Sequence, residues 1–166
     1  MVAYDPGEWS DFFVAVAGAS AALLGLLFVA VSINLQRILE YDGLPERALE
    51  TLLLLLSVLI VAFMGLAPGQ AHTAVGIEVL VLGLLMGLVS ARIPVYAVDE
   101  RTGEEPVGWR LSRWGVRAFS IVPFVLGGLS LLLETGGGLY WILAGTVFAT
   151  CGAVAGAWVL MVEILR

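Results

Sequence analysis

Long apolar stretches separated by short polar ones dominate the chain. Five of these stretches are long enough to cross a bilayer, because about 20 apolar residues in a helix span its hydrocarbon core. Charged residues gather between the stretches and do not alternate with apolar residues inside them. This pattern predicts a polytopic membrane protein whose spans are residues 11–34, 49–67, 74–92, 117–134 and 139–163.

The composition supports the same interpretation. The chain is 60% hydrophobic and only 13% charged, and a soluble domain of 166 residues could not cover so much apolar surface with so few polar groups. The predicted fold class is therefore all-α, with residues 1–166 forming one transmembrane helix bundle. The amino-terminal segment is acidic where a signal peptide would be basic, so the first span is expected to remain in the mature protein.

The arginines predict how the chain is oriented. All eight basic residues are arginines, and every one falls in the loop at 35–48, in the region 92–117 or at the carboxy-terminus. In a five-span topology these segments share one side, which the positive-inside rule makes cytoplasmic. We therefore expect a multi-pass protein of the plasma (inner) membrane, with its amino-terminus outside and its cytoplasmic loop at 93–116.

Small residues recur at heptad spacing in the first, third and fifth spans, and we call these rows the first, second and third seams. Small residues let membrane helices approach closely. The three spans run in the same direction, so we expect their seams to form the centre of the bundle, with left-handed packing near +20°. The leucine-rich second span has no seam and is expected to face lipid. The first seam is Asp11, Ala15, Gly18, Ala22, Gly25, Val29, Ser32 and Gln36; the second is Gly76, Leu80, Gly83, Gly87 and Ser90; the third is Gly138, Ile142, Gly145, Ala149, Gly152, Gly156, Val159 and Glu163.

The first seam has two interpretations. In one, it packs against another helix within or between protomers, as small residues spaced by four positions do. In the other, it lines a water-filled path with Asp11 at the outer mouth and with Ser32 and Gln36 at the inner end. Acidic residues at a pore mouth favour cations, so such a path would prefer them.

A further candidate surface precedes the fourth span. Arg110, Arg113 and Arg117 are spaced i, i+3 and i+7, which places them on one face of a short interfacial helix. Two roles are open for this face. It contacts anionic lipid headgroups, or it docks a partner protein.

Other polar residues give little support for enzyme chemistry. Glu78 is the most membrane-immersed acid, and His72 is the only histidine, but two groups are too few for a metal site. The chain has no His/Cys cluster, no phosphate-binding glycine loop and no Gly-x-Ser-x-Gly elbow. We expect the Ser20 hydroxyl to bond to its own helix backbone. We therefore predict no enzyme, no metal and no cofactor, and the net charge of −6 also predicts no nucleic-acid partner.

The amino-terminal region resembles a known group of proteins. Residues 9–13 read WSDFF and residues 18–32 read GASAALLGLLFVAVS. This opening, within the first 35 residues, is similar to that of small integral membrane proteins common in actinobacteria. Most members are uncharacterised, and some carry an automatic label as modulators of a membrane-bound AAA protease. The resemblance implies a small membrane protein and assigns no catalytic or binding residue.

Two functions follow from these features. The first is a homo-oligomeric channel or permeability pathway that prefers cations, with the first seam lining the path. The alternative is a non-transporting scaffold or regulator that binds another membrane protein. The expected partners are membrane lipids and either further copies of the chain or a second membrane protein.

Overall fold

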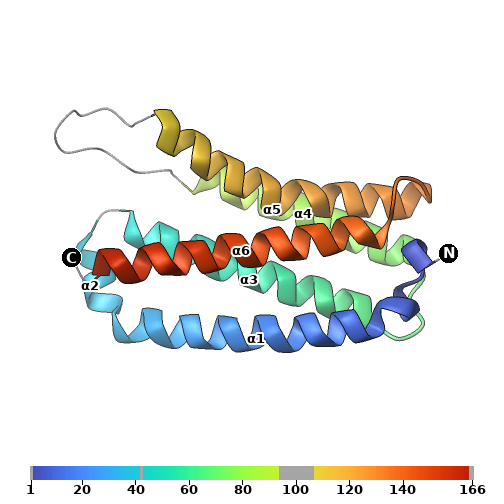
Figure 1. Ribbon diagram of the computed structural model, residues 1–166, viewed down its shortest axis with the longest axis horizontal. Helices are drawn as coiled ribbons and strands as arrows, with labels where there is room; N and C mark the ends of the chain where they lie inside the picture. The colour runs from blue at the N-terminus through green and yellow to red at the C-terminus, as the bar shows by residue number, and fades with distance from the viewer. Residues whose placement is uncertain (1, 42, 94–106, 165–166) are drawn as a thin grey trace.

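The computed structural model describes residues 2–41, 43–93 and 107–164, and in the last range it describes the side chains of 114–163 (Figure 1). Within these residues every regular element is helical. Two 3₁₀-helices begin the chain, and one short and five long α-helices follow. Their bounds are η1 Val2–Tyr4, η2 Pro6–Trp9, α1 Ser10–Ile33, α2 Leu35–Glu40, α3 Leu44–Leu66, α4 His72–Arg92, α5 Val107–Leu133 and α6 Leu139–Ile164.

Helices α1, α3, α4, α5 and α6 are each long and apolar enough to cross a membrane, as the hydrophobic pattern predicts. Most observed bounds lie close to the predicted spans. The largest difference is at α5, which begins at Val107 and not near residue 117. The short helix expected before the fourth span is therefore continuous with it.

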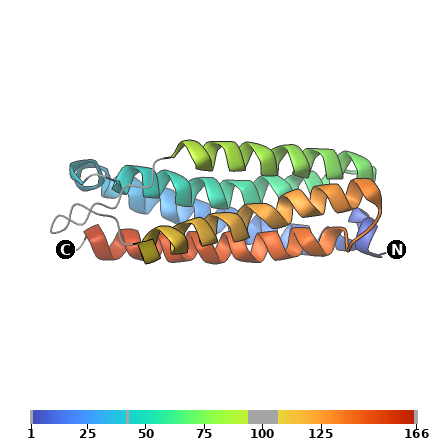
Figure 2. The ribbon, with the colours of Figure 1, turned by 90° about the horizontal axis from the view of Figure 1, so that it is seen from above.

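The five long helices lie side by side and alternate in direction (Figures 1 and 2). Helices α1, α4 and α6 run in the same direction, as expected. Helix α1 packs mainly on α3, which also contacts α6, while α4 and α5 form a closely packed hairpin beside them. The end of the bundle where α3 and α5 begin carries Arg47 and Arg117, and we call it the arginine end.

Helix α3 lies at the centre of the bundle, so the expectation that this leucine-rich span faces lipid is wrong. We compared the share of residues that is buried in the most apolar 18-residue window of each span. This share is 39% in α3 and 44% in α5, but only 6% in α1. Leu54, Val58 and Val61 of α3 all belong to the main hydrophobic core. The physical reason is that leucine suits a bilayer and a helix interface equally well, so apolar character alone does not separate the two environments.

The second seam packs on α5 and not on the other seams. A Cβ atom added at Gly76 of α4 would lie 3.1 Å from the backbone oxygen of Gly128 on α5. A Cβ atom at Gly128 would lie 2.7 Å from the backbone nitrogen of Leu80 and 2.8 Å from the backbone oxygen of Gly76. The two backbones therefore approach as closely as glycine permits.

The third seam packs on two neighbouring helices. A Cβ atom at Gly145 would lie 2.9 Å from the ring of Phe124 on α5, and one at Gly156 would lie 2.6 Å from the hydroxyl of Thr51 on α3. Ala149, in the same seam, is fully buried. The three seams therefore do not share a centre, and that expectation is wrong. The second and third seams each pack on the helices that the fold places beside them.

Candidate functional site

The first seam lies on the outside of the bundle. Its members on α1 are all exposed, and a Cβ atom added at Gly18 or Gly25 would meet nothing within 4 Å. Helix α1 packs on α3 through its opposite side, where Phe13 and Ser20 are buried. Within the described part of the chain, the seam therefore faces neither another helix nor an enclosed path.

The polar members of the first seam do not form one continuous row. Asp11 lies in the first turn of α1 and is exposed. The hydroxyl of Ser32 donates a hydrogen bond of 2.7 Å to the carbonyl of Phe28, so it is bound to its own helix. Gln36 lies beyond the end of α1, on the separate helix α2. The seam on α1 thus ends at Ser32, and between Asp11 and Ser32 its side chains are apolar or absent.

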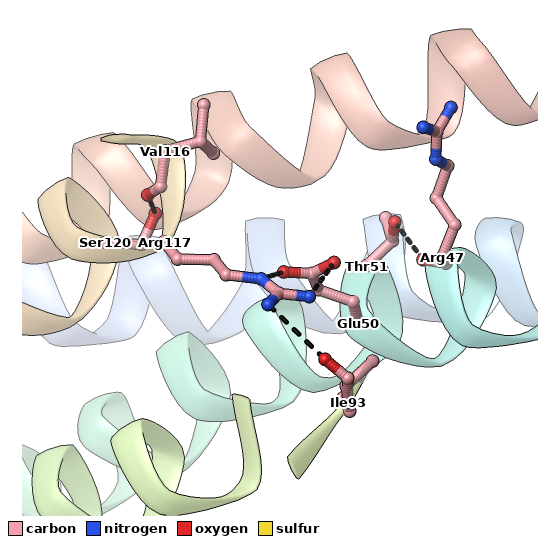
Figure 3. A network of polar contacts seen from close by, with 7 residues as sticks. All are labelled: Arg47, Glu50, Thr51, Ile93, Val116, Arg117 and Ser120. Atoms are coloured by element: carbon pink, nitrogen blue, oxygen red, sulfur yellow. Dashed lines mark hydrogen bonds and ion pairs between the residues drawn. The ribbon is translucent and has the colours of Figure 1, made fainter. Parts of the chain in front are cut away.

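A buried ion pair lies at the arginine end (Figure 3). The Nε and Nη2 atoms of Arg117 on α5 donate to the two carboxylate oxygens of Glu50 on α3, the second at 3.1 Å. Arg117 is only 4% exposed. Its Nη1 atom also lies 3.5 Å from the backbone oxygen of Ile93, the residue that follows α4. One guanidinium therefore contacts α3 and the carboxyl end of α4.

The position of Arg117 differs from the exposed face expected for it. Arg117 lies on the same helix as Arg110 and Arg113, as their spacing predicts. However, the ion pair with Glu50 holds the Arg117 side chain between helices. The side chains of Arg110 and Arg113 lie outside the described residues. Glu50 itself was not predicted as a site residue, although an acid inside a predicted span is a signal that could have identified it.

A second ion pair lies nearby on α3. Arg47 Nη1 is 3.2 Å from Glu163 Oε1 near the end of α6. The hydroxyl of Thr51 donates to the backbone oxygen of Arg47 at 2.8 Å, and Figure 3 shows this bond beside the Glu50 contacts. Because Arg47 and Glu50 are one turn apart, α3 holds both α5 and α6 at the arginine end.

A narrow pocket reaches this buried pair from the side of the bundle. Helices α3, α4 and α5 form its walls, and most of its lining is apolar. The lining residues are Glu50, Leu53, Leu54, Met86, Val89, Ser90, Ile93, Arg117 and Ile121.

The opposite end of the bundle carries the remaining candidate groups. His72 Nε2 lies 3.0 Å from Glu134 Oε1, which links the start of α4 to the residue after α5. Glu78 accepts a hydrogen bond of 2.7 Å from the amide of Gln70, and not from His72. Among the described residues, no group of three or more His, Cys, Asp and Glu side chains is arranged to hold a metal ion.

The Ser20 hydroxyl makes the kind of hydrogen bond that its sequence context predicts. Its hydroxyl donates a hydrogen bond of 2.7 Å to the backbone oxygen of Val16, one turn earlier in α1. This bond confirms the expected backbone role.

Comparison of the chain with models of known families, with characterised proteins and with solved structures gave no match.

Proposed function

We propose that this protein is a non-transporting membrane scaffold or regulator that binds a transmembrane helix of another membrane protein on the first seam. The observation that carries the proposal is the open space over Gly18 and Gly25. By contrast, the glycines of the second and third seams all contact neighbouring helices of the same chain. In a bilayer, an exposed row of small residues offers close van der Waals contact to an incoming helix.

The length and chemistry of this face suit a helix partner. From Ala15 to Ser32 the seam extends about 25 Å at 1.5 Å per residue, which is most of the hydrocarbon thickness. Elsewhere the outer surface of the bundle carries large side chains such as Phe63, which suits contact with lipid tails, and Trp158, which suits the membrane interface. The seam lies within the stretch that resembles the small actinobacterial membrane proteins.

A cation-preferring channel formed by several copies is the second candidate. It is favoured by the exposed Asp11 at one end of the seam and by the exposed Gln36 beyond the other end. Copies arranged with α1 toward a common axis would place polar groups at both mouths of a path. The apolar stretch between Asp11 and Ser32 favours dry packing instead, so we rank the channel second.

Replacing Gly18 and Gly25 together with Leu is expected to abolish partner binding while the bundle still folds, because both positions face open space. The measurement is affinity capture of the tagged protein from native membranes after mild crosslinking, with recovered proteins identified by mass spectrometry. Ala19→Leu with Ala30→Leu is the matched control, since both alanines are exposed on α1 but lie outside the seam. Equal recovery of partners by the glycine double variant and the wild type would contradict the proposal.

The purified protein in liposomes is expected to show no cation conductance above that of empty vesicles. A scaffold that presents a dry helix face offers water no continuous path. Single-channel recording or a cation-flux dye provides the measurement. A conductance that is present in the wild type and lost in both Asp11→Asn and Gly25→Leu would support the channel and reject the scaffold.

A further inference from the structure

We propose that a hollow at the end of the bundle opposite the arginine end binds a small organic cation with two ammonium groups. We call it the acidic hollow, and its lining residues are Tyr4, Asp5, Pro6, Gln70, Ala71, His72 and Glu134. Its volume is about 550 Å³, which lies within the range of small-molecule sites. This inference concerns a different part of the molecule from the first seam and does not rest on the proposed function.

Three segments that are distant in the sequence build the acidic hollow. The segment before α1 supplies Tyr4 and Asp5, the start of α4 supplies His72, and the residue after α5 is Glu134. All three segments lie at the end of the bundle that carries the amino-terminus (Figure 1). The Tyr4 hydroxyl accepts a hydrogen bond of 3.2 Å from the backbone N–H of Gly137, which joins the first segment to the turn between α5 and α6. The hollow is therefore a product of the tertiary fold and not of one loop.

The two carboxylates of the acidic hollow each keep one oxygen that can accept a hydrogen bond. Asp5 Oδ1 accepts from the backbone N–H of Gly7 at 3.0 Å, and Glu134 Oε1 lies 3.0 Å from His72 Nε2. Within the described part of the chain, the second oxygen of each carboxylate has no partner. Because the two carboxylates come from different segments, a ligand with an ammonium group at each end can contact both.

Gln70 supplies a third acceptor. Its amide nitrogen donates to Glu78 Oε1 at 2.7 Å, since carboxylate oxygens accept. The Oε1 atom of Gln70 is buried and has no hydrogen-bond partner among the described residues. Gln70 also lines a second hollow of about 300 Å³, which shares Asp5 and Pro6 with the first. A buried acceptor without a donor is costly, so this region favours a ligand that donates hydrogen bonds.

The charge of the lining favours a cation. Two of the lining residues are carboxylates, and His72 is the only basic one. The chain has no lysine, and its arginines fall in the loop at 35–48, in the region 92–117 and at the carboxy-terminus. A hollow lined by one sign of charge concentrates ions of the opposite sign. The ring of Tyr4 adds an aromatic surface that an ammonium group can contact.

The arrangement of the acidic hollow favours an organic cation over a metal ion. Asp5, His72 and Glu134 all line it, yet among the described residues no three such side chains are arranged to hold a metal ion. A metal ion needs several ligand atoms at about 2.0–2.6 Å. Two ammonium groups joined by a short chain can instead contact carboxylates that are well separated.

The test is isothermal titration calorimetry of the intact protein in phosphatidylcholine nanodiscs, with 1,4-diaminobutane as the probe. The comparison probes are 1,4-butanediol, which has the same chain without charge, and Mg²⁺ at the same ionic strength. We expect saturable binding of the diamine, no binding of the diol and weaker binding of Mg²⁺. Absence of diamine binding, or binding of the diol or Mg²⁺ as tight as that of the diamine, would overturn the proposal.

A pair of double variants separates the acidic hollow from the general charge of this end. Asp5→Asn with Glu134→Gln removes both lining carboxylates and should weaken diamine binding about tenfold. Glu8→Gln with Asp11→Asn removes the same charge from exposed positions outside the hollow, and screening by salt should limit its effect to about twofold. Equal weakening by the two double variants would show a diffuse acidic surface and overturn the site.

A second pair of variants tests the space itself without changing charge. Ala71→Trp fills the acidic hollow and is expected to abolish diamine binding, whereas Thr73→Trp, at an exposed position outside it, should bind as the wild type does. Unchanged binding in Ala71→Trp would contradict the assignment of the ligand to this hollow. The Gly18→Leu and Gly25→Leu double variant should bind the diamine normally, so failure of the seam proposal and failure of this one are distinguishable.

Discussion

Replacing Arg117 with Met is expected to destabilise the protein by about 3–5 kcal/mol, because it removes the buried guanidinium that forms an ion pair with the largely buried Glu50 carboxylate. Glu50→Met should have an effect of similar size, since it leaves a buried guanidinium. The double variant is expected to recover most of the loss, because well-packed apolar side chains can replace a buried ion pair. Unfolding followed by circular dichroism in mild detergent, titrated with a denaturing detergent, measures each difference.

The pair on α3 and α6 provides a graded comparison. Glu163 is more exposed than Glu50, with a side chain that is 39% accessible. Arg47→Met should therefore cost less than Arg117→Met, because water screens the remaining charge. If Arg117→Met cost less than about 1 kcal/mol, the range of an exposed surface pair, the buried-pair interpretation would be wrong.

Replacing Gly128 with Leu is expected to prevent the α4–α5 hairpin from closing and to abolish folding of the native bundle. Even the first side-chain atom would lie 2.7 Å from the Leu80 backbone nitrogen, and backbone cannot move aside as a flexible side chain can. Gly128→Ala, which adds only that atom, should cost about 1–3 kcal/mol through overpacking. The measurement is the same denaturing-detergent titration, together with recovery of monodisperse protein by size-exclusion chromatography.

Gly25→Ala is the control for this prediction, since its added atom meets open space. It should be neutral or stabilising by up to about 1 kcal/mol, the usual gain from replacing a helical glycine with alanine. If Gly128→Ala and Gly25→Ala behaved alike, the close backbone contact between α4 and α5 would be contradicted.

The helices and their ends were largely predictable from the sequence, because both depend on local chemistry. The length of an apolar stretch decides whether its helix can span a membrane. Pro45 begins α3 as a first-turn residue, and the glycines at 136–138 adopt the positive φ that a tight turn requires. Ser20 bonds to its own helix for the same local reason. The continuity of α5 back to Val107 was the main difference, since a polar interfacial turn and a membrane span can share one helix.

The partners of these helices were not predictable. Heptad rows of small residues are present in three spans, yet two of the rows pack on α3 and α5, and only the row on α1 remains outside. A single sequence shows which face of a helix has residues small enough for close packing. It does not show which other helix packs on that face. Glu50 and Arg117 are 67 positions apart, so no local pattern joins them.

The sequence by itself therefore determined that this is an all-helical membrane protein, where its spans and turns lie, and which faces are small. Each of these follows from interactions within a few residues along the chain. Only the tertiary structure decided that α3 is central, that the first seam faces outward and that Arg117 is buried against Glu50. The reason is that the bilayer accepts every apolar face equally, so the mutual fit of whole helices, and the need to pair a buried charge, settle which faces turn inward.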